Sequence, residues 1–183
     1  MSCVELVIAV WFTLAPWYQD RTDTETARRD LYRPVASAIC KEASNNHEVL
    51  AAMTQAYSET KLARAVLEWR CKDMPKGSQC DHGRAMGPFQ NWKRGCPAVW
   101  DEKLSTEERY QAGARCFFRD FREGTRRCRS EEGGFYAQLG AIGCKAHWAA
   151  RRVRMMSRME MTFYSLRKKR TDEIARSDDP TTE

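Results

Sequence analysis

A helical repeat of apolar residues over residues 45–69 places the strongest constraint on how this chain can fold. Asn45 and Glu48, three residues apart, form a capping-box pattern immediately before the apolar run begins. The apolar residues that follow recur at the spacing of one helix face. The pattern predicts a single amphipathic helix from Asn45 to about Trp69.

One acidic residue, Glu59, lies on the apolar face of this predicted helix. Its neighbours one and two turns away are mostly small and apolar, and include Ala52, Ala56 and Val66. Carboxylates are rarely buried without a partner, and desolvation raises a carboxyl pKa, as suits a general acid near neutral pH. The alternative places Glu59 at the helix edge, or in a surface pair with Lys61 or Arg64.

A turn-rich loop follows the helix and ends in Gly87, Pro88, Phe89 and Gln90. Its glycines and prolines predict turns, with a small β element, and glycine lets a ligand approach the backbone closely. The alternative is an ordinary turn region closed by a disulfide.

Three segments together resemble soluble lytic transglycosylases and goose-type lysozymes. Residues 58–63 resemble the glutamate signature of that group, and residues 87–90 resemble its following glycine-to-glutamine segment. Residues 135–140 resemble its later tyrosine-containing segment, and the resemblance covers roughly residues 45–155.

The resemblance implies a mainly α, lysozyme-like domain in which a small loop or β element lines a cleft. The implied reaction is cleavage of the β-1,4 bond between N-acetylmuramic acid and N-acetylglucosamine in peptidoglycan, without metal or organic cofactor. Glu59 would be the general acid and base, and Asp81 would position water in a hydrolase. The implied substrate-binding residues are Gly87, Phe89, Gln90, Trp92 and Tyr136. Gln90 has the alternative role of capping its own loop, and Trp92 that of a core residue.

Two departures from the family pattern motivate a second hypothesis. Trp92 stands where goose-type lysozymes carry a further Asp, and Leu139 stands at the position of the family tyrosine. The second hypothesis is a peptidoglycan-binding or structural module that keeps the fold without the chemistry. A third is a basic helical protein that binds membranes or nucleic acid.

Eight cysteines favour disulfides formed in an oxidising compartment. The chain has no CxxC pair and only three histidines, so a zinc module is not predicted. The predicted pairs are Cys71 with Cys80, Cys96 with Cys116, and Cys128 with Cys144, while Cys3 and Cys40 are candidates for free thiols. The alternative is a set of reduced, buried thiols. Disulfides predict an extracytoplasmic protein that is secreted, periplasmic, or a phage lysin or virion-associated enzyme.

The length of 183 residues fits one domain. Residues 1–20 hold an apolar run that is too short to span a bilayer and lacks signal-peptide features, so it is expected to pack on the domain. Residues 21–170 form the predicted catalytic domain, and residues 171–183 a polar, frayed tail. Further helices are predicted over residues 22–43, bent or split at Pro34, and over residues 105–121, 131–139 and 145–170.

The basic charge is concentrated near the C-terminus. The net charge is +6, and residues 145–170 contain nine basic residues and one acidic residue, Glu160. One interpretation is a solvated helix face; the other is attraction to anionic cell-wall polymers or outer-leaflet lipids. No nucleic-acid reader motif accompanies the charge, so specific nucleic-acid binding is not predicted.

Overall fold

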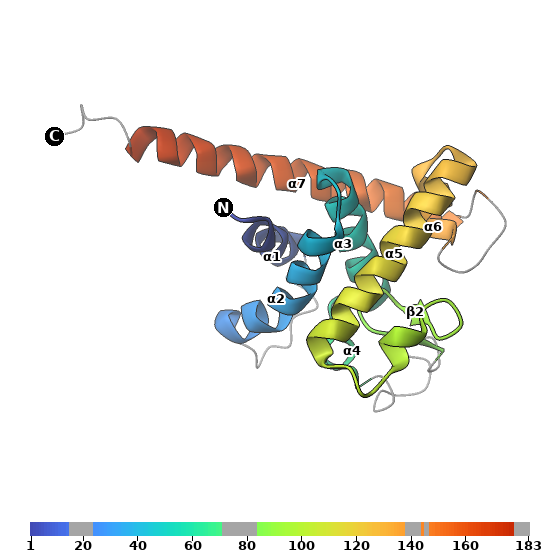
Figure 1. Ribbon diagram of the computed structural model, residues 1–183. Helices are drawn as coiled ribbons and strands as arrows, with labels where there is room; N and C mark the ends of the chain where they lie inside the picture. The colour runs from blue at the N-terminus through green and yellow to red at the C-terminus, as the bar shows by residue number, and fades with distance from the viewer. Residues whose placement is uncertain (15–23, 71–83, 138–143, 145–146, 178–183) are drawn as a thin grey trace.

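The computed structural model describes residues 1–14, 24–70, 84–137, 144 and 147–177, and it is mainly helical, as predicted (Figure 1). Its helices are α1 (Cys3–Leu14), α2 (Glu25–Glu42), α3 (Asn46–Thr60), α4 (Arg64–Leu67), the 3-10 helix η4 (Pro97–Trp100), α5 (Thr106–Cys128), α6 (Glu131–Ala137) and α7 (His147–Ser177). The strands β1 (Ala85–Met86) and β2 (Asn91–Trp92) form a two-stranded antiparallel hairpin.

Helix α3 is the centre of the molecule. It contacts α1, α2, α5 and α7, and every residue from position 48 to position 57 is buried. A helix enclosed on several sides is expected to carry apolar or small residues on most of its surface, and Leu50, Ala51, Ala52 and Met53 in succession meet that requirement.

The predicted helix over residues 45–69 is wrong in its second half, because α3 ends at Thr60. The Thr60 hydroxyl donates to the carbonyl of Ala56 at 2.6 Å and accepts from the backbone N–H of Leu62 at 3.0 Å. Lys61 and Leu62 both have positive φ, of 50° and 56°. A threonine side chain that bonds the backbone in this way competes with helical hydrogen bonds. The chain therefore turns, and the short helix α4 starts a new direction.

Two other helices differ from their predictions. Helix α2, which Thr24 caps, continues through Pro34 without splitting and ends at Glu42. Helix α5 starts with a capping box of Ser105 and Glu108, and it extends beyond the predicted end at residue 121 to Cys128.

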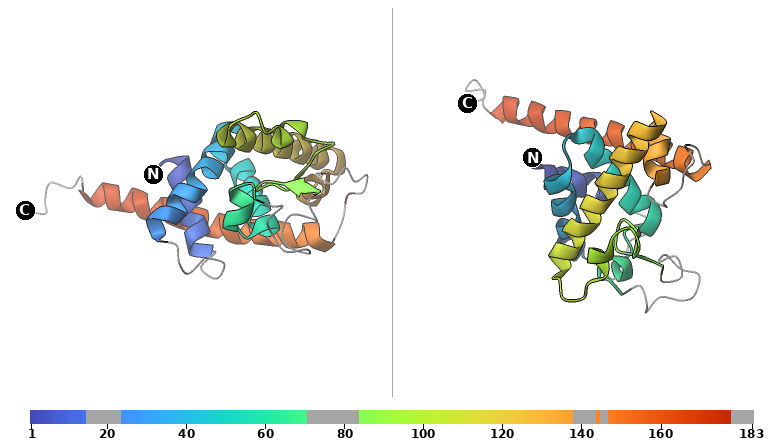
Figure 2. Two further views of the ribbon diagram at one scale, coloured as in Figure 1. Left: turned by 90° about the horizontal axis from the view of Figure 1, so that it is seen from below. Right: turned by 45° about the vertical axis from the view of Figure 1, so that its right-hand side comes forward.

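The polar tail predicted from residue 171 is likewise wrong in part, since α7 runs to Ser177. Figures 1 and 2 show the end of α7 projecting past the other helices, where its side chains are mostly exposed.

Three disulfides join the described elements. The predicted pairs Cys96–Cys116 and Cys128–Cys144 are confirmed. Cys3 and Cys40, taken as candidate free thiols, instead form a disulfide that links α1 to α2. The bridge spans 37 positions of sequence, so only the packing of the two helices brings these cysteines together. Cys71 and Cys80 lie outside the described residues.

The N-terminal apolar run forms α1, which packs against α2 and α7. Trp11 is fully buried, and its indole N–H donates to the carbonyl of Met53 in α3 at 3.4 Å. Trp17 and Tyr18, at the end of the same apolar run, lie outside the described residues. Across the described part of the chain, no helix combines the length and apolar character that a membrane crossing requires.

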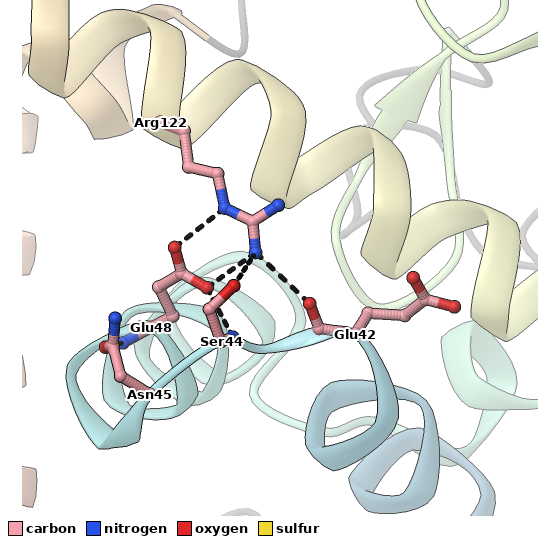
Figure 3. A network of polar contacts seen from close by, with 5 residues as sticks. All are labelled: Glu42, Ser44, Asn45, Glu48 and Arg122. Atoms are coloured by element: carbon pink, nitrogen blue, oxygen red, sulfur yellow. Dashed lines mark hydrogen bonds and ion pairs between the residues drawn. The ribbon is translucent and has the colours of Figure 1, made fainter.

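A buried carboxylate ties the start of α3 to α5 (Figure 3). Glu48 is 8% exposed, and its two oxygens accept from Nε and Nη2 of Arg122 at 2.7 and 2.6 Å. The same Arg122 nitrogen Nη2 also donates to the Ser44 hydroxyl and to the carbonyl of Glu42. Glu48 also accepts from the backbone N–H of Ser44 at 2.7 Å. One arginine thus holds the turn between α2 and α3 against α5.

Acid should weaken the ion pair of Glu48 and Arg122, which we call the clamp. The hydrogen bond from Arg122 lowers the pKa of Glu48 below its ordinary value of 4.5. Because the pKa is lower in the folded state, the stabilisation is fully present above about pH 4.5 and is lost as pH falls through the folded-state pKa. Glu48→Gln should lower the free energy of unfolding at pH 7 by about 1–3 kcal/mol and flatten its decline in acid.

Denaturant unfolding between pH 3 and 7 measures this effect. Glu160→Gln is the matched control, because Glu160 is an exposed carboxylate on α7, and its stability should stay within about 0.5 kcal/mol of the parent. An identical acid profile in Glu48→Gln and the parent would show that the clamp does not control acid stability.

Candidate functional site

Glu59 lies at the last turn of α3 and pairs with Arg152 of α7. The Glu59 side chain is 25% exposed and that of Arg152 is 14% exposed. Burial lowers the pKa of Arg152 to about 10, which still leaves the guanidinium charged at neutral pH. A neighbouring guanidinium favours the charged form of a carboxylate. Glu59 is therefore partly accessible, and it forms an ion pair with Arg152, a residue that the predicted surface pairs did not include.

The β-hairpin is fixed against α3 one turn before Glu59. The side-chain amide of Gln55 donates to the carbonyl of Phe89, in the hairpin turn, at 3.2 Å. Phe89 is 1% exposed and stacks on Phe117 of α5, with ring centroids 5.7 Å apart. The hairpin is consequently held by two helices, and residues far apart in sequence gather near the end of α3.

Gly87, in the turn of the hairpin, packs tightly against the indole ring of Trp69. Gly87 has φ 73°, and a Cβ at this position would lie 2.6 Å from Cη2 of Trp69. The indole also lies under the guanidinium of Arg109, 4.1 Å from the ring centroid, and 5.2 Å from the ring of Tyr110. The Tyr110 hydroxyl donates to the carbonyl of Leu67, and burial raises the tyrosine pKa. This packing leaves no room for a side chain at residue 87.

The predicted substrate-binding residues of the hairpin differ in accessibility. Gly87 and Phe89 are buried, so they shape the hairpin and present no side chain to a ligand. The Gln90 amide donates to the carbonyl of Gly87 at 3.0 Å, which is the capping role named as its alternative. Trp92 is 39% exposed and stays available for stacking on a sugar ring.

Two predicted residues cannot be placed. Asp81 lies outside the described residues, and so does the side chain of Tyr136, although its backbone belongs to α6. Of the predicted site, the structure therefore describes the end of α3 and the hairpin that Gln55 of α3 contacts.

Sequence analysis missed Arg152, although a signal was present. Arg152 precedes Met156 by four residues, and Met156, Met159 and Phe163 form the buried stripe of α7. Helical spacing therefore places Arg152 on the inward face. The sequence analysis treated all basic residues of the segment 145–170 as exposed to solvent or to an anionic polymer. It therefore did not single out Arg152 as a residue of the inward face.

A methyl group at residue 87 should disturb the hairpin. Gly87→Ala forces a positive φ on a residue with a side chain and drives Cβ into the Trp69 ring, which we expect to cost about 1–3 kcal/mol. Gly95→Ala is the control, because the nearest heavy atom to its Cβ would be 3.8 Å away. Thermal unfolding compares the two variants, and equal melting temperatures would contradict the packing described above.

The described residues contain no group of three or more His, Cys, Asp or Glu side chains that could hold a metal ion. The chain matches no protein-family model, and it shows no significant similarity to a curated protein sequence or to a solved structure. Any functional assignment therefore depends on the chemistry of the site itself.

Proposed function

We propose that this protein cleaves the β-1,4 bond between N-acetylmuramic acid and N-acetylglucosamine in peptidoglycan, with Glu59 as general acid and base. The observation that carries the proposal is a partly exposed carboxylate at the end of a buried helix, one turn after Gln55, which bonds the hairpin that displays Trp92. A carboxylate held on a rigid helix can be aimed at one bond of a polymer. The indole of Trp92 supplies an apolar face for a sugar ring.

The chemistry requires two proton transfers at one carboxyl group. Protonated Glu59 donates its proton to the glycosidic oxygen as the bond to the muramoyl C1 breaks. The resulting carboxylate then takes a proton either from the muramoyl 6-hydroxyl, giving a 1,6-anhydro end, or from an attacking water, giving a reducing end. Glu59 takes part in the first step as the carboxylic acid and in the second step as the carboxylate, the form that pairs with Arg152.

The three disulfides support an extracytoplasmic location for this activity. Disulfides persist in oxidising compartments and are rare in the cytosol. The described residues hold Cys3–Cys40, Cys96–Cys116 and Cys128–Cys144, which is consistent with a protein that works where peptidoglycan lies.

The ion pair also favours a second candidate function. If Glu59 serves only to neutralise Arg152, the protein is a peptidoglycan-binding or structural module without catalysis. The two candidates differ in one measurable property, which is the release of soluble fragments from purified peptidoglycan.

Replacing Glu59 by glutamine should abolish cleavage and leave the fold intact. Glutamine keeps an oxygen that can accept from Arg152 but cannot transfer a proton. We expect the rate of fragment release to fall by about 10²–10⁴-fold. The measurement is turbidity loss of purified sacculi, with mass spectrometry of the products to separate anhydro from reducing ends.

Glu68→Gln is the matched control, because Glu68 is another partly exposed carboxylate, paired with Arg64 and Arg70. Its cleavage rate should equal that of the parent. Full activity in folded Glu59→Gln would refute the assignment of Glu59. A parent protein that binds sacculi but releases nothing would establish the non-catalytic module instead.

A further inference from the structure

A pocket of about 300 Å³ lies between the outer half of α7 and the first residues of α1 and α3. Cys3 and Leu6 line it from α1, Asn46 lines it from α3, and Phe163 and Arg167 line it from α7. Figure 1 shows this end of α1 below the part of α7 that projects past the other helices. Three elements that are distant in sequence therefore form one enclosed space.

The pocket is separate from the candidate site. Asn46 is the first residue of α3, and Glu59 lies in the last turn of the same helix. A helix rises about 1.5 Å per residue, so these two residues are about 20 Å apart along the helix axis. The pocket thus lies at the opposite end of α3 from the carboxylate proposed for catalysis, and what binds there is independent of the proposed function.

The inner wall of the pocket is apolar and is held in place. Leu6 is 5% exposed and Phe163 is 2% exposed, and both belong to the main hydrophobic core. The disulfide between Cys3 and Cys40 fixes this end of α1 to α2. The wall is therefore formed before any ligand arrives, as is usual for sites that bind small molecules.

The outer wall is cationic, because one face of α7 changes its character along the helix. Arg167 and Arg170 follow Phe163 by four and seven residues, so all three residues lie on one face. Both arginines line the pocket and are exposed. None of the described residues that line it is acidic. The pocket therefore joins an apolar wall to a positively charged mouth.

The two arginines differ in their partners. Arg170 pairs with Glu173 of the same helix at 3.3 Å. The guanidinium of Arg167 forms no hydrogen bond or ion pair within the part of the chain that the structure describes. A guanidinium presents its N–H donors in a planar fork that matches a carboxylate or a phosphate. Arg167 is therefore ready to receive an anionic group at the mouth of the pocket.

We propose that this pocket binds a single-chain amphiphile with an anionic head group. The head group lies on Arg167 and Arg170, and the chain lies against Leu6 and Phe163. A small inorganic anion would leave the apolar wall uncovered, and a neutral apolar molecule would leave Arg167 without a partner. A molecule that combines the two properties gains from both, because burial of its chain adds to charge-assisted hydrogen bonds of its head group.

Titration of the full-length, disulfide-bonded protein with decanoate tests the pocket, with calorimetry and NMR as the measurements. Decanol supplies the same chain without the charge, and acetate supplies the charge without the chain. Both should bind at least about tenfold more weakly than decanoate. Arg167→Gln should weaken decanoate binding at least about tenfold. Nuclear Overhauser contacts of the decanoate chain should include the ring of Phe163.

Lys168→Gln is the matched control, because Lys168 is the next residue of α7, is exposed and does not line the pocket. Its decanoate affinity should stay within about twofold of the parent. Equal losses in the two variants would assign binding to overall charge and overturn the pocket. Decanol or acetate that binds as tightly as decanoate would overturn the amphiphile as the ligand.

Vesicles of anionic phospholipid separate a membrane surface from a single amphiphile. A parent protein that binds such vesicles but not monomeric decanoate would make this face of α7 a membrane-docking surface, and the proposal would be rejected. Absence of binding to both would reject it as well. Decanoate binding that requires Arg167, spares Lys168→Gln and shows contacts with Phe163 would establish the pocket.

Discussion

The enclosure of α3 is the constraint on which the rest of the structure depends. In a helix buried on several sides, an unpaired polar group costs free energy comparable to a lost hydrogen bond. Four polar residues of α3 accordingly attach another element or end the helix. Glu48 attaches α5, Gln55 attaches the hairpin, and Thr60 ends the helix. Glu59 attaches α7 through Arg152.

Local features of this fold could be predicted from the sequence, because their causes lie within a few residues. The caps at Asn45 and Ser105 are of this kind. The bridges Cys96–Cys116 and Cys128–Cys144 were also predictable, because each joins cysteines that follow one another in the sequence at a shorter spacing than Cys3 and Cys40. The Cys3–Cys40 bridge was not, because it depends on how α1 packs on α2. The break after Thr60 was also missed, since apolar spacing continues through it and only the hydroxyl contacts reveal the turn.

The sequence alone points to Glu59 as the acidic residue of the candidate site, but it does not identify Arg152 as the partner of Glu59. Glu59 stands out because a charged residue interrupts an apolar stripe. Arg152 does not, because it lies among other basic residues, and only tertiary packing separates an inward arginine from solvated ones. Phe89 also shows how packing adds to what the sequence implies. A family resemblance suggested a ligand contact, while its stacking on Phe117 makes it part of the core.

Stability alone gives a weak reason for the pair of Glu59 and Arg152. Replacing a buried ion pair by apolar residues of similar volume is often neutral or stabilising. A carboxylate in the last turn of a helix also faces the negative end of the helix dipole. Arg152 offsets both costs, and its main consequence is to hold one carboxylate, a quarter exposed, at the end of the helix whose Gln55 bonds the hairpin. A prepared proton acceptor needs that arrangement, whereas a purely structural contact does not require the carboxylate to remain accessible.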